Sequence, residues 1–244
     1  MDVTKFLYNE TLVWTLTTNG YKFYTLNLVR RLQALKVPWT LCIVCADRQC
    51  YRYFIGEGIP AILYKEAQRD SLPSMILFGS KAFQEINLVK LNLLDTFAKT
   101  ESIKRCMYLD GDIFVGSDFL PDILTRLEES SLLFQCDEYE REGCKSPCTN
   151  MCTGIIAWKH GHDGGIFKMN KKSEWLTAPE DQRWVNNKLR ELAVPCTTLP
   201  RNLYPNGRLS DPPPPDFLIL HYNWLVGPSK QVRMRKNKHW LLPY

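Results

Sequence analysis

Two aspartates separated by one glycine interrupt an apolar run near the middle of this chain, in the segment Met107 to Val115 (MYLDGDIFV). If the segment is a β-strand, alternation of side chains between faces puts Asp110 and Asp112 on the same side. Gly111 between them would let a ligand or another backbone approach closely. Two carboxylates at the end of a buried strand suit Mg²⁺ or Mn²⁺, ions whose coordination substrate phosphates commonly complete. The alternative is a β-hairpin, because Asp-Gly between apolar runs is a strong hairpin signal.

A lysine twenty residues before Asp110 is the second candidate for chemistry. The spacing predicts a helix from Phe83 to Phe97, and its apolar stripe consists of Phe83, Ile86, Leu93, Leu94 and Phe97. Lys90 lies four residues from Ile86 and four from Leu94, so it points inward with them. It could extend along the stripe to the surface. Since an inward lysine usually has a partner, we expect a bound phosphate or a strand-end carboxylate beside it.

The elements before these residues predict a parallel sheet. A buried strand (Leu12 to Thr17), a helix (Tyr21 to Leu35) and a second buried strand (Trp39 to Ala46) form a βαβ unit. Ligands of such sheets bind at the carboxyl ends of the strands. The polar residues at that end of the first strand are Thr17, Thr18 and Asn19. They are candidates for contacting a nucleotide, and an ordinary polar turn explains them equally well.

The remaining elements continue the pattern. Further strands are predicted at Pro60 to Tyr64, Leu132 to Cys136, Gly154 to Trp158, Thr197 to Leu199 and Phe217 to His221. Helices are predicted at Asp122 to Glu128 and at Glu180 to Leu192. Asp47, after the second strand, could meet a nucleotide or cap a helix. We find no internal repeat and no linker, so we expect one α/β domain over residues 1–244.

Apolar runs, motifs and charge argue against several classes of protein. No apolar run approaches the roughly 20 residues of a membrane span, and residues 1–8 lack the pattern of a secretory signal. The first predicted turn has neither G-x-G-x-x-G nor a P-loop, so neither a dinucleotide-binding oxidoreductase nor a P-loop enzyme is supported. The formal charge is +5, and several of the basic residues lie near the end of the sequence. Such a segment could be solvated, contact an anionic polymer or lipid, or hold a polyphosphate.

The nine cysteines are odd in number and scattered. Four of them have the spacing C-x7-C-x3-C-x3-C, namely Cys136, Cys144, Cys148 and Cys152. This spacing lacks the C-x2-C pairs of most zinc sites. We therefore expect reduced thiols and a cytoplasmic protein.

With these elements placed, the chain resembles the metal-dependent GT-A glycosyltransferases from about Leu12 to Trp240. It is most similar to the nucleotide-diphospho-sugar transferase family, which includes plant cell-wall and algal-virus enzymes. Asp110-Gly111-Asp112 matches that family's D-x-D motif, and Lys90 resembles its basic residue at the donor site. Cys152-Thr153-Gly154 resembles its Asn-Thr-Gly strand, with cysteine in place of asparagine.

Two later segments extend the resemblance. Pro179-Glu180-Asp181-Gln182 resembles the family's Asp-Gln segment beside the donor sugar, which makes Asp181 and then Gln182 candidates near the anomeric carbon. The segment His221 to Lys230 resembles its late His…Gly…Lys signature. The resemblance implies that His221 ligates the metal with Asp110 and Asp112, and that Gly227 and Lys230 contact the donor phosphates.

The resemblance implies a single-domain GT-A fold, with a Rossmann-like mixed sheet flanked by helices. It also implies transfer of a sugar from a nucleoside-diphosphate donor, UDP-linked by expectation, to a saccharide or glycoprotein hydroxyl, with retention. The cofactor would be Mn²⁺ or Mg²⁺, since carboxylate and imidazole together suit Mn²⁺. A nucleic-acid partner is not expected.

Two other functions compete with this interpretation. A sugar nucleotidyltransferase would also use an α/β sheet and a divalent ion, but its glycine-rich, arginine-containing loop has no counterpart at Thr18-Asn19-Gly20-Tyr21. A non-catalytic nucleic-acid-binding module would use the basic residues near the end of the chain. No zinc-finger or RNP-like pattern accompanies them.

Overall fold

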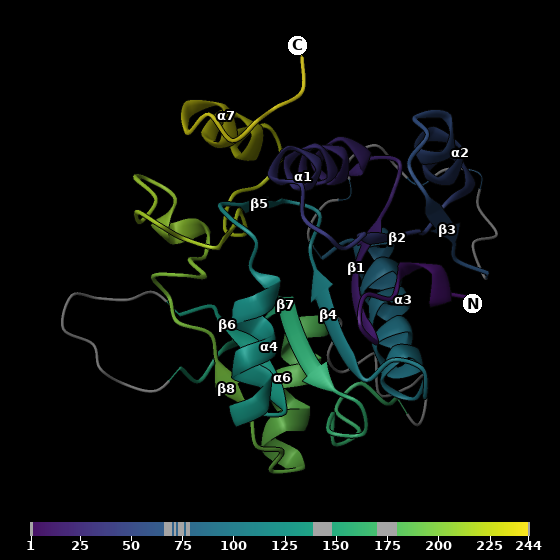
Figure 1. Cartoon of the computed structure of the whole chain (residues 1–244), viewed down its shortest axis with the longest axis vertical. Helices are drawn as coiled ribbons and strands as arrows, with labels where there is room; N and C mark the ends of the chain where they lie inside the picture. Colours follow the sequence, from purple (N-terminus) through teal and green to yellow (C-terminus); the bar gives the residue numbers. More distant parts are fainter. Residues whose placement is uncertain are drawn as a thin grey trace.

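A seven-stranded mixed sheet lies at the centre of the protein, with strand order β3-β2-β1-β4-β7-β6-β8 (Figure 1). The computed structural model describes residues 2–65, 70, 72, 76, 79–138, 148–169 and 180–243. Strands β1 to β4 run parallel, β7 runs antiparallel to both β4 and β6, and β8 is parallel to β6. The predicted α/β fold with a mixed sheet is therefore confirmed. The extent of the domain, residues 1–244, stays a prediction.

The predicted βαβ unit is present. It consists of β1 (Thr11–Thr17), α1 (Lys22–Leu35) and β2 (Cys42–Cys45), and it follows a short 3-10 helix, η1 (Thr4–Phe6). Strand β2 is shorter than predicted and begins only after Leu41. It leads into α2 (Arg48–Gly56) and β3 (Ala61–Leu63). Asp47 caps α2 by accepting a hydrogen bond from the backbone N–H of Cys50 at 2.8 Å, so the cap explains this aspartate.

The Asp-Gly-Asp segment is a turn that connects two sheets. It follows β4 (Arg105–Leu109) and precedes β5 (Ile113–Val115), which pairs with β9 (Ile219–His221) in a separate two-stranded sheet. Both expectations for the segment are therefore wrong: it is neither a continuous strand nor a hairpin, since β4 and β5 pair with different strands. In the β5–β9 register Ile113 lies opposite His221, which brings the histidine next to Asp112.

Apart from their ends, the remaining predicted elements are present, namely α3 (Lys81–Ala98), α4 (Leu120–Glu129), β6 (Leu132–Cys136), β7 (Met151–Lys159), α6 (Asp181–Glu191) and β8 (Thr197–Thr198). The 3-10 helix η2 (Gly207–Leu209) and the helix α7 (Pro228–Lys236) were not predicted. The helix predicted from Glu180 begins at Asp181, with Glu180 as its N-cap, and Pro179 of the Pro-Glu-Asp-Gln segment lies outside the described residues. Among the described residues, no helix is long and apolar enough to cross a bilayer.

The sheet is buried on both faces because its strands are apolar on both. Trp14 of β1 belongs to the core that α3 and α6 cover, whereas Val13 belongs to the core that α1, α2 and α4 cover. Strands buried on both faces have continuous apolar runs, which is what the sequence of β1 and β2 shows. A third, smaller core joins Phe114, Leu220, Tyr222 and Met234.

The end of the described chain lies beside α1, as Figure 1 shows for α7 and the segment after it. The Asn27 side chain donates to the backbone carbonyl of His239 at 2.9 Å and accepts from the backbone N–H of Leu241 at 2.6 Å. The His239 ring stacks on Phe114, with 3.8 Å between ring centroids. These contacts hold α7 over the carboxyl end of the sheet.

Candidate metal and donor site

A cavity of about 620 Å³ opens at the carboxyl ends of β1 and β4. Most of the predicted site residues line it: Thr17, Thr18, Lys90, Asp110, Asp112, Asp181, Gln182, His221 and Lys230. Asn19 and Gly227 do not line it. The Asn19 side chain accepts from Lys22 at 2.8 Å and its backbone N–H donates to Asp47 at 2.8 Å, so it serves the turn. Gly227, with φ of 57°, begins α7 and thereby positions Lys230.

Three potential metal ligands converge in the cavity. His221 Nε2 lies 3.4 Å from Asp110 Oδ2 and 3.3 Å from Asp112 Oδ1. One ligand atom from each residue lies within 4.8 Å of the others. The turn after β4 and the end of β9 bring these side chains together, rather than the alternation of side chains along a strand. The predicted association of Asp110, Asp112 and His221 is present in the structure, although a turn, and not one continuous strand, brings the two aspartates together.

The tautomer of His221 follows from its neighbour Gln135. The Gln135 amide nitrogen donates to the backbone carbonyls of Tyr204 and Pro205 at 3.1 and 3.0 Å, which fixes the orientation of the amide. Its oxygen therefore faces His221 Nδ1 at 2.8 Å, and Nδ1 must carry the hydrogen. Burial would lower the pKa of His221, but Asp112 outweighs burial and raises it, so without a metal Nε2 carries a proton that pairs with the two carboxylates. A divalent ion would take the place of this proton, and an oriented imidazole together with two carboxylates fits Mn²⁺ or Mg²⁺.

Neighbouring positive charges lower the pKa values of both aspartates. Burial would raise the pKa of Asp110, but Lys90 and His221 outweigh burial and lower it to about 2. Burial likewise opposes ionisation of Asp112, yet Lys230 and His221 bring its pKa well below the usual range. Both carboxylates are therefore ionised at neutral pH. Tyr108 donates to Asp110 Oδ1 at 2.6 Å and holds this carboxylate in place.

A glycine makes room for the three ligands. A Cβ on Gly154 would lie 2.1 Å from His221 Cε1 and 2.7 Å from Asp110 Oδ2, far inside contact distance. Gly111 has a similar role, since a Cβ there would lie 2.5 Å from the Thr25 hydroxyl. The close approach predicted at Gly111 is thus made by a side chain of α1.

Lys90 is buried and bridges two carboxylates. Its Nζ lies 2.7 Å from Asp181 Oδ2 and 3.3 Å from Asp110 Oδ1, and 4.3 Å from the centre of the Tyr108 ring. Of the two partners expected for this lysine, the structure contains the carboxylate. Burial would lower the pKa of Lys90, but the two aspartates outweigh it and raise it. The lysine is therefore charged, and it joins α3 both to α6 and to the turn that carries Asp110.

Lys230 is the second buried cation. It forms an ion pair with Asp112 Oδ2, and its Nζ lies 5.7 and 5.8 Å from the ring centres of Tyr21 and Tyr24. Burial disfavours the charge, but Asp112 outweighs burial and raises the pKa of Lys230. Lys230 thus lies beside the cluster of Asp110, Asp112 and His221, on the side of α1.

The predicted pair Asp181 and Gln182 lies on the opposite side of the cavity. Asp181 Oδ2 accepts from Thr153 at 2.7 Å in addition to Lys90. The Gln182 amide donates to Asp137 Oδ2 at 2.9 Å and to Asn150 Oδ1 at 3.2 Å. Residues 139–147, between β6 and β7, lie outside the described residues. Asp137 and Asn150, on either side of them, line the cavity.

Several residues that shape the site were not among those predicted from the sequence, namely Tyr108, Gln135, Asp137, Asn87, Asn223 and Trp224. A buried glutamine at the end of an apolar strand was a signal for Gln135. A register shift in the β6–β7 pairing falls between Phe134 and Gln135, and such bulges re-aim side chains near active sites. Asn87 Nδ2 and Thr18 Oγ1 are buried at the cavity and make no hydrogen bond with the part of the chain that the structure describes.

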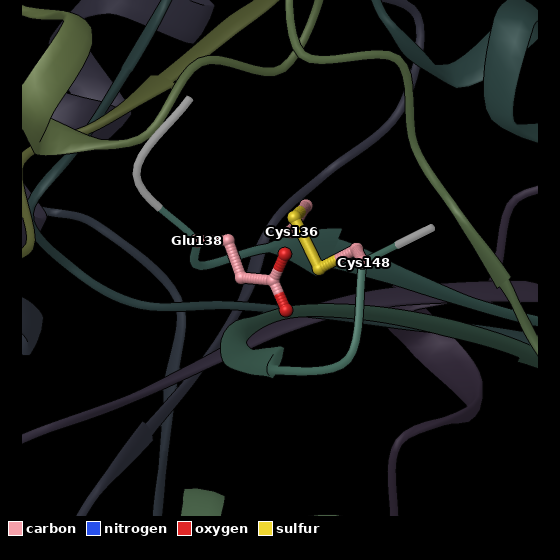
Figure 2. Close-up of side chains that lie close together, drawn as sticks. All are labelled: Cys136, Glu138 and Cys148. Carbon is pink, nitrogen blue, oxygen red and sulfur yellow. A yellow bond between two sulfur atoms is a disulfide. The ribbon is translucent and has the colours of Figure 1, made fainter. Parts of the chain in front are cut away.

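A second cluster of potential ligands consists of Cys136, Glu138 and Cys148 (Figure 2). Cys136 and Cys148 form a disulfide, with Cα atoms 5.9 Å apart. The expectation of reduced thiols is therefore wrong for these two cysteines. Oxidised sulfurs lack the thiolate that binds zinc, so the structure does not support a metal here. The disulfide instead joins the end of β6, next to Asp137, to the segment that precedes Asn150 and β7.

Comparison with known proteins agrees with the geometry. Residues 40–234 match the family described as nucleotide-diphospho-sugar transferase. The β-arabinofuranosyltransferase RAY1 of Arabidopsis thaliana is 25% identical over 261 aligned positions, which cover 94% of this chain and 47% of that protein. The chain thus spans about half the length of this relative.

Two solved structures have a similar fold. The galactosyltransferase LgtC, solved with donor and acceptor sugar analogues, superposes with a TM-score of 0.58 at 14% identity, covering 95% of this chain and 97% of that one. A glycosyltransferase involved in glycosylation of the major capsid of PBCV-1 superposes with a TM-score of 0.54 at 12% identity, covering 93% and 98%. Because the family match extends over most of the sequence and the fold is that of GT-A glycosyltransferases, this chain belongs to the nucleotide-diphospho-sugar transferase family.

Proposed function

We propose that this chain is a metal-dependent glycosyltransferase. It transfers a hexosyl or pentosyl group from a nucleoside-diphosphate sugar, UDP-linked, to a hydroxyl of a saccharide or glycoconjugate, with retention. The observation that carries the proposal is the convergence of Asp110, Asp112 and His221 in a cavity, with the histidine oriented by Gln135 so that Nε2 faces both carboxylates. Such a set suits a divalent cation, and a nucleotide diphosphate is the usual second partner of that cation.

Other residues that line the cavity support binding of the nucleotide and of the diphosphate. Thr17 and Thr18 lie at the end of β1, the position where α/β sheets bind nucleotides. Lys230 lies beside the metal group, where its charge would stabilise the departing diphosphate. Asn87 and Thr18 offer buried polar atoms that a polar ligand would satisfy.

The chemistry needs no nucleophilic serine or cysteine. In the proposed step the bond between the anomeric carbon and the donor phosphate oxygen breaks, and the acceptor hydroxyl oxygen forms the new bond. The hydroxyl proton passes to the departing phosphate oxygen on the same face of the sugar. A bound divalent ion would supply Lewis-acid stabilisation of the diphosphate. Asp181, held by Lys90 and Thr153, would stabilise positive charge at the anomeric carbon, and Gln182 would lie beside it.

The names of the relatives support a sugar as the transferred group. RAY1 is described as a β-arabinofuranosyltransferase and LgtC as a galactosyltransferase, one pentosyl and one hexosyl enzyme. Their difference leaves both sugar classes within the proposal. A screen of UDP-linked pentoses and hexoses, with Mn²⁺ or Mg²⁺, identifies the donor by thermal stabilisation of the protein.

The test of the proposed function is Asp112→Asn. The substitution keeps the shape of the side chain and removes one of the ligand charges, so transfer should fall by at least about 100-fold. The thermal stabilisation that UDP gives together with Mn²⁺ should fall with it. Asp70→Asn, at a side chain that is 80% exposed, is the matched control and should behave as wild type. Full activity of Asp112→Asn with an unchanged Mn²⁺ requirement would refute the metal site.

A further inference from the structure

The rim of the cavity carries an exposed tryptophan. Trp224 lines the cavity and yet is 49% exposed, an unusual position for so large an apolar side chain. Its neighbour Val226, also at the cavity, is 69% exposed. The backbone of Trp224 has φ of 59°, in the left-handed region that bulky residues rarely adopt. A residue kept in such a conformation is held there by its surroundings, and residues of this kind cluster at functional sites.

Two contacts fix the orientation of the indole ring. Its N–H donates to Asp137 Oδ1 at 2.9 Å, and Asp137 also accepts from Asn223 at 2.6 Å. The Arg208 guanidinium carbon lies 3.5 Å from the centre of the ring, so a planar cation covers one face. Because the ring is half exposed while one face is covered, its exposure belongs mainly to the other face.

A glycine supports the same segment. A Cβ on Gly207 would lie 2.0 Å from the backbone oxygen of Asn223, and the Gly207 N–H donates to the Asn223 side chain at 2.7 Å. The segment therefore packs tightly on η2, and the indole is a rigid, pre-oriented surface rather than a mobile side chain. Rigid aromatic surfaces lose little conformational entropy when a ligand binds.

Asp137 connects this surface to the reaction centre. Its other carboxylate oxygen accepts from Gln182, the residue next to Asp181. The strand order β1-β4-β7-β6 puts the nucleotide end of β1 on one side of the metal turn after β4, and Asp137, after β6, on the other. The indole is thus anchored on the side of the cavity remote from the proposed nucleotide position.

We propose that Trp224 forms an acceptor subsite, in which the exposed face of the indole binds the apolar C–H face of a saccharide ring. The inference rests on the proposed function and adds the residue that selects a sugar acceptor. Sugars present C–H groups on one face and hydroxyls around the edge, and an indole offers an apolar face with a polar handle already satisfied by Asp137. Val226 extends the apolar surface at the same rim.

The experiment uses two substitutions at this position. Trp224→Leu removes the ring, and Trp224→Phe keeps an aromatic face while losing the indole N–H. At saturating donor and Mn²⁺, Trp224→Leu should raise KM for a saccharide acceptor by about tenfold with a smaller change in kcat, and Trp224→Phe should recover much of the loss. Phe23→Leu, at a residue that is also 49% exposed but does not line the cavity, is the matched control.

A binding measurement makes the test independent of turnover. Methyl glycosides of arabinose, galactose, xylose and glucose are titrated while tryptophan fluorescence is recorded. At least one should change the emission of wild type, and that change should be absent from Trp224→Phe. If Trp224→Leu instead weakens UDP binding and leaves acceptor KM unchanged, the indole contacts the nucleobase and the acceptor subsite is refuted. Transfer with an unaltered acceptor KM in Trp224→Leu refutes the subsite alone, whereas absence of any UDP and Mn²⁺ binding to wild type refutes the proposed function.

Discussion

Single residues decide whether the three proposed metal ligands can meet. His221 Nε2 approaches both aspartates only because Gly154 has no side chain and because Gln135 holds the imidazole in one tautomer. The two supports are of different kinds, one steric and one a hydrogen bond. Loss of an outer contact of this kind typically lowers metal affinity by about 10- to 100-fold.

Gly154→Ala tests the steric support. A methyl group 2.1 Å from the His221 ring must displace the ring or the strand, so Mn²⁺ affinity should fall by at least about tenfold. Mn²⁺-dependent thermal stabilisation measures this affinity. Gly56→Ala is the control, because a Cβ there meets no atom within 4 Å. Unchanged Mn²⁺ binding by Gly154→Ala would show that His221 is not a ligand.

At the scale of elements, the site is a junction of two sheets. Strand β4 belongs to the large sheet and β5 to the small one, and the turn between them carries both aspartates. Helices α3 and α6 are joined to this turn through Lys90, which bonds to Asp110 and Asp181. The disulfide between Cys136 and Cys148 joins β6 to the segment before β7, next to the residues that hold Gln182.

Lys90→Met tests the connection between these elements. The substitution leaves two carboxylates without their cation, so the free energy of unfolding of the metal-free protein should fall by about 2–4 kcal/mol, somewhat less than for a fully buried pair because Asp110 is partly exposed. Mn²⁺ should restore part of the loss by pairing with Asp110. Urea denaturation with and without Mn²⁺ measures both effects.

Lys99→Met is the control for Lys90. It lies on the same helix and removes an exposed pair with Asp95, which should contribute only about 0–1 kcal/mol. Equal stability of Lys90→Met and wild type would mean that the buried ion pairs contribute nothing to the fold. In that case a donor phosphate would be the partner that matters for Lys90.

At the scale of the whole molecule, the last part of the described chain closes over the first. Residues after β9 pack on α1 through Asn27, and they bring Lys230 to Asp112, 118 residues away in the sequence. A metal ion bound at Asp112 would compete with Lys230 for this carboxylate, so binding of metal and diphosphate would change the partner of the lysine. We infer that α7 closes the donor site and excludes water when both ligands are bound.

Limited proteolysis tests this closure. UDP together with Mn²⁺ should protect the segment after Val226 from cleavage more than either ligand alone. Lys230→Ala should lose the added protection, because the cation that contacts diphosphate is gone. Lys236→Ala, on the same helix as Lys230, removes an exposed partner of Asp211 and should retain the added protection. The same cleavage rate with and without the two ligands would show that α7 is a static element.

Much of this protein was determined by the sequence alone. The α/β order and the inward Lys90 followed from local periodicity, because these signals lie within a few residues of one another. The mixed sheet and the association of His221 with the two aspartates were implied by the resemblance to a family, which short motifs at separate places in the chain carry. Helix and strand ends were off by a few residues, as at β2, where flanking contacts decide the boundary.

Tertiary structure alone decided how the site is assembled. The change of sheet after β4, the orientation of His221 by Gln135, the disulfide and the Asp137 contacts with Gln182 and Trp224 carry no local signal. Gln135 and His221 are 86 residues apart in the chain, and Asp137 and Trp224 are 87 residues apart. Such contacts depend on strand register and on packing between distant elements, which the periodicity of any single segment does not contain.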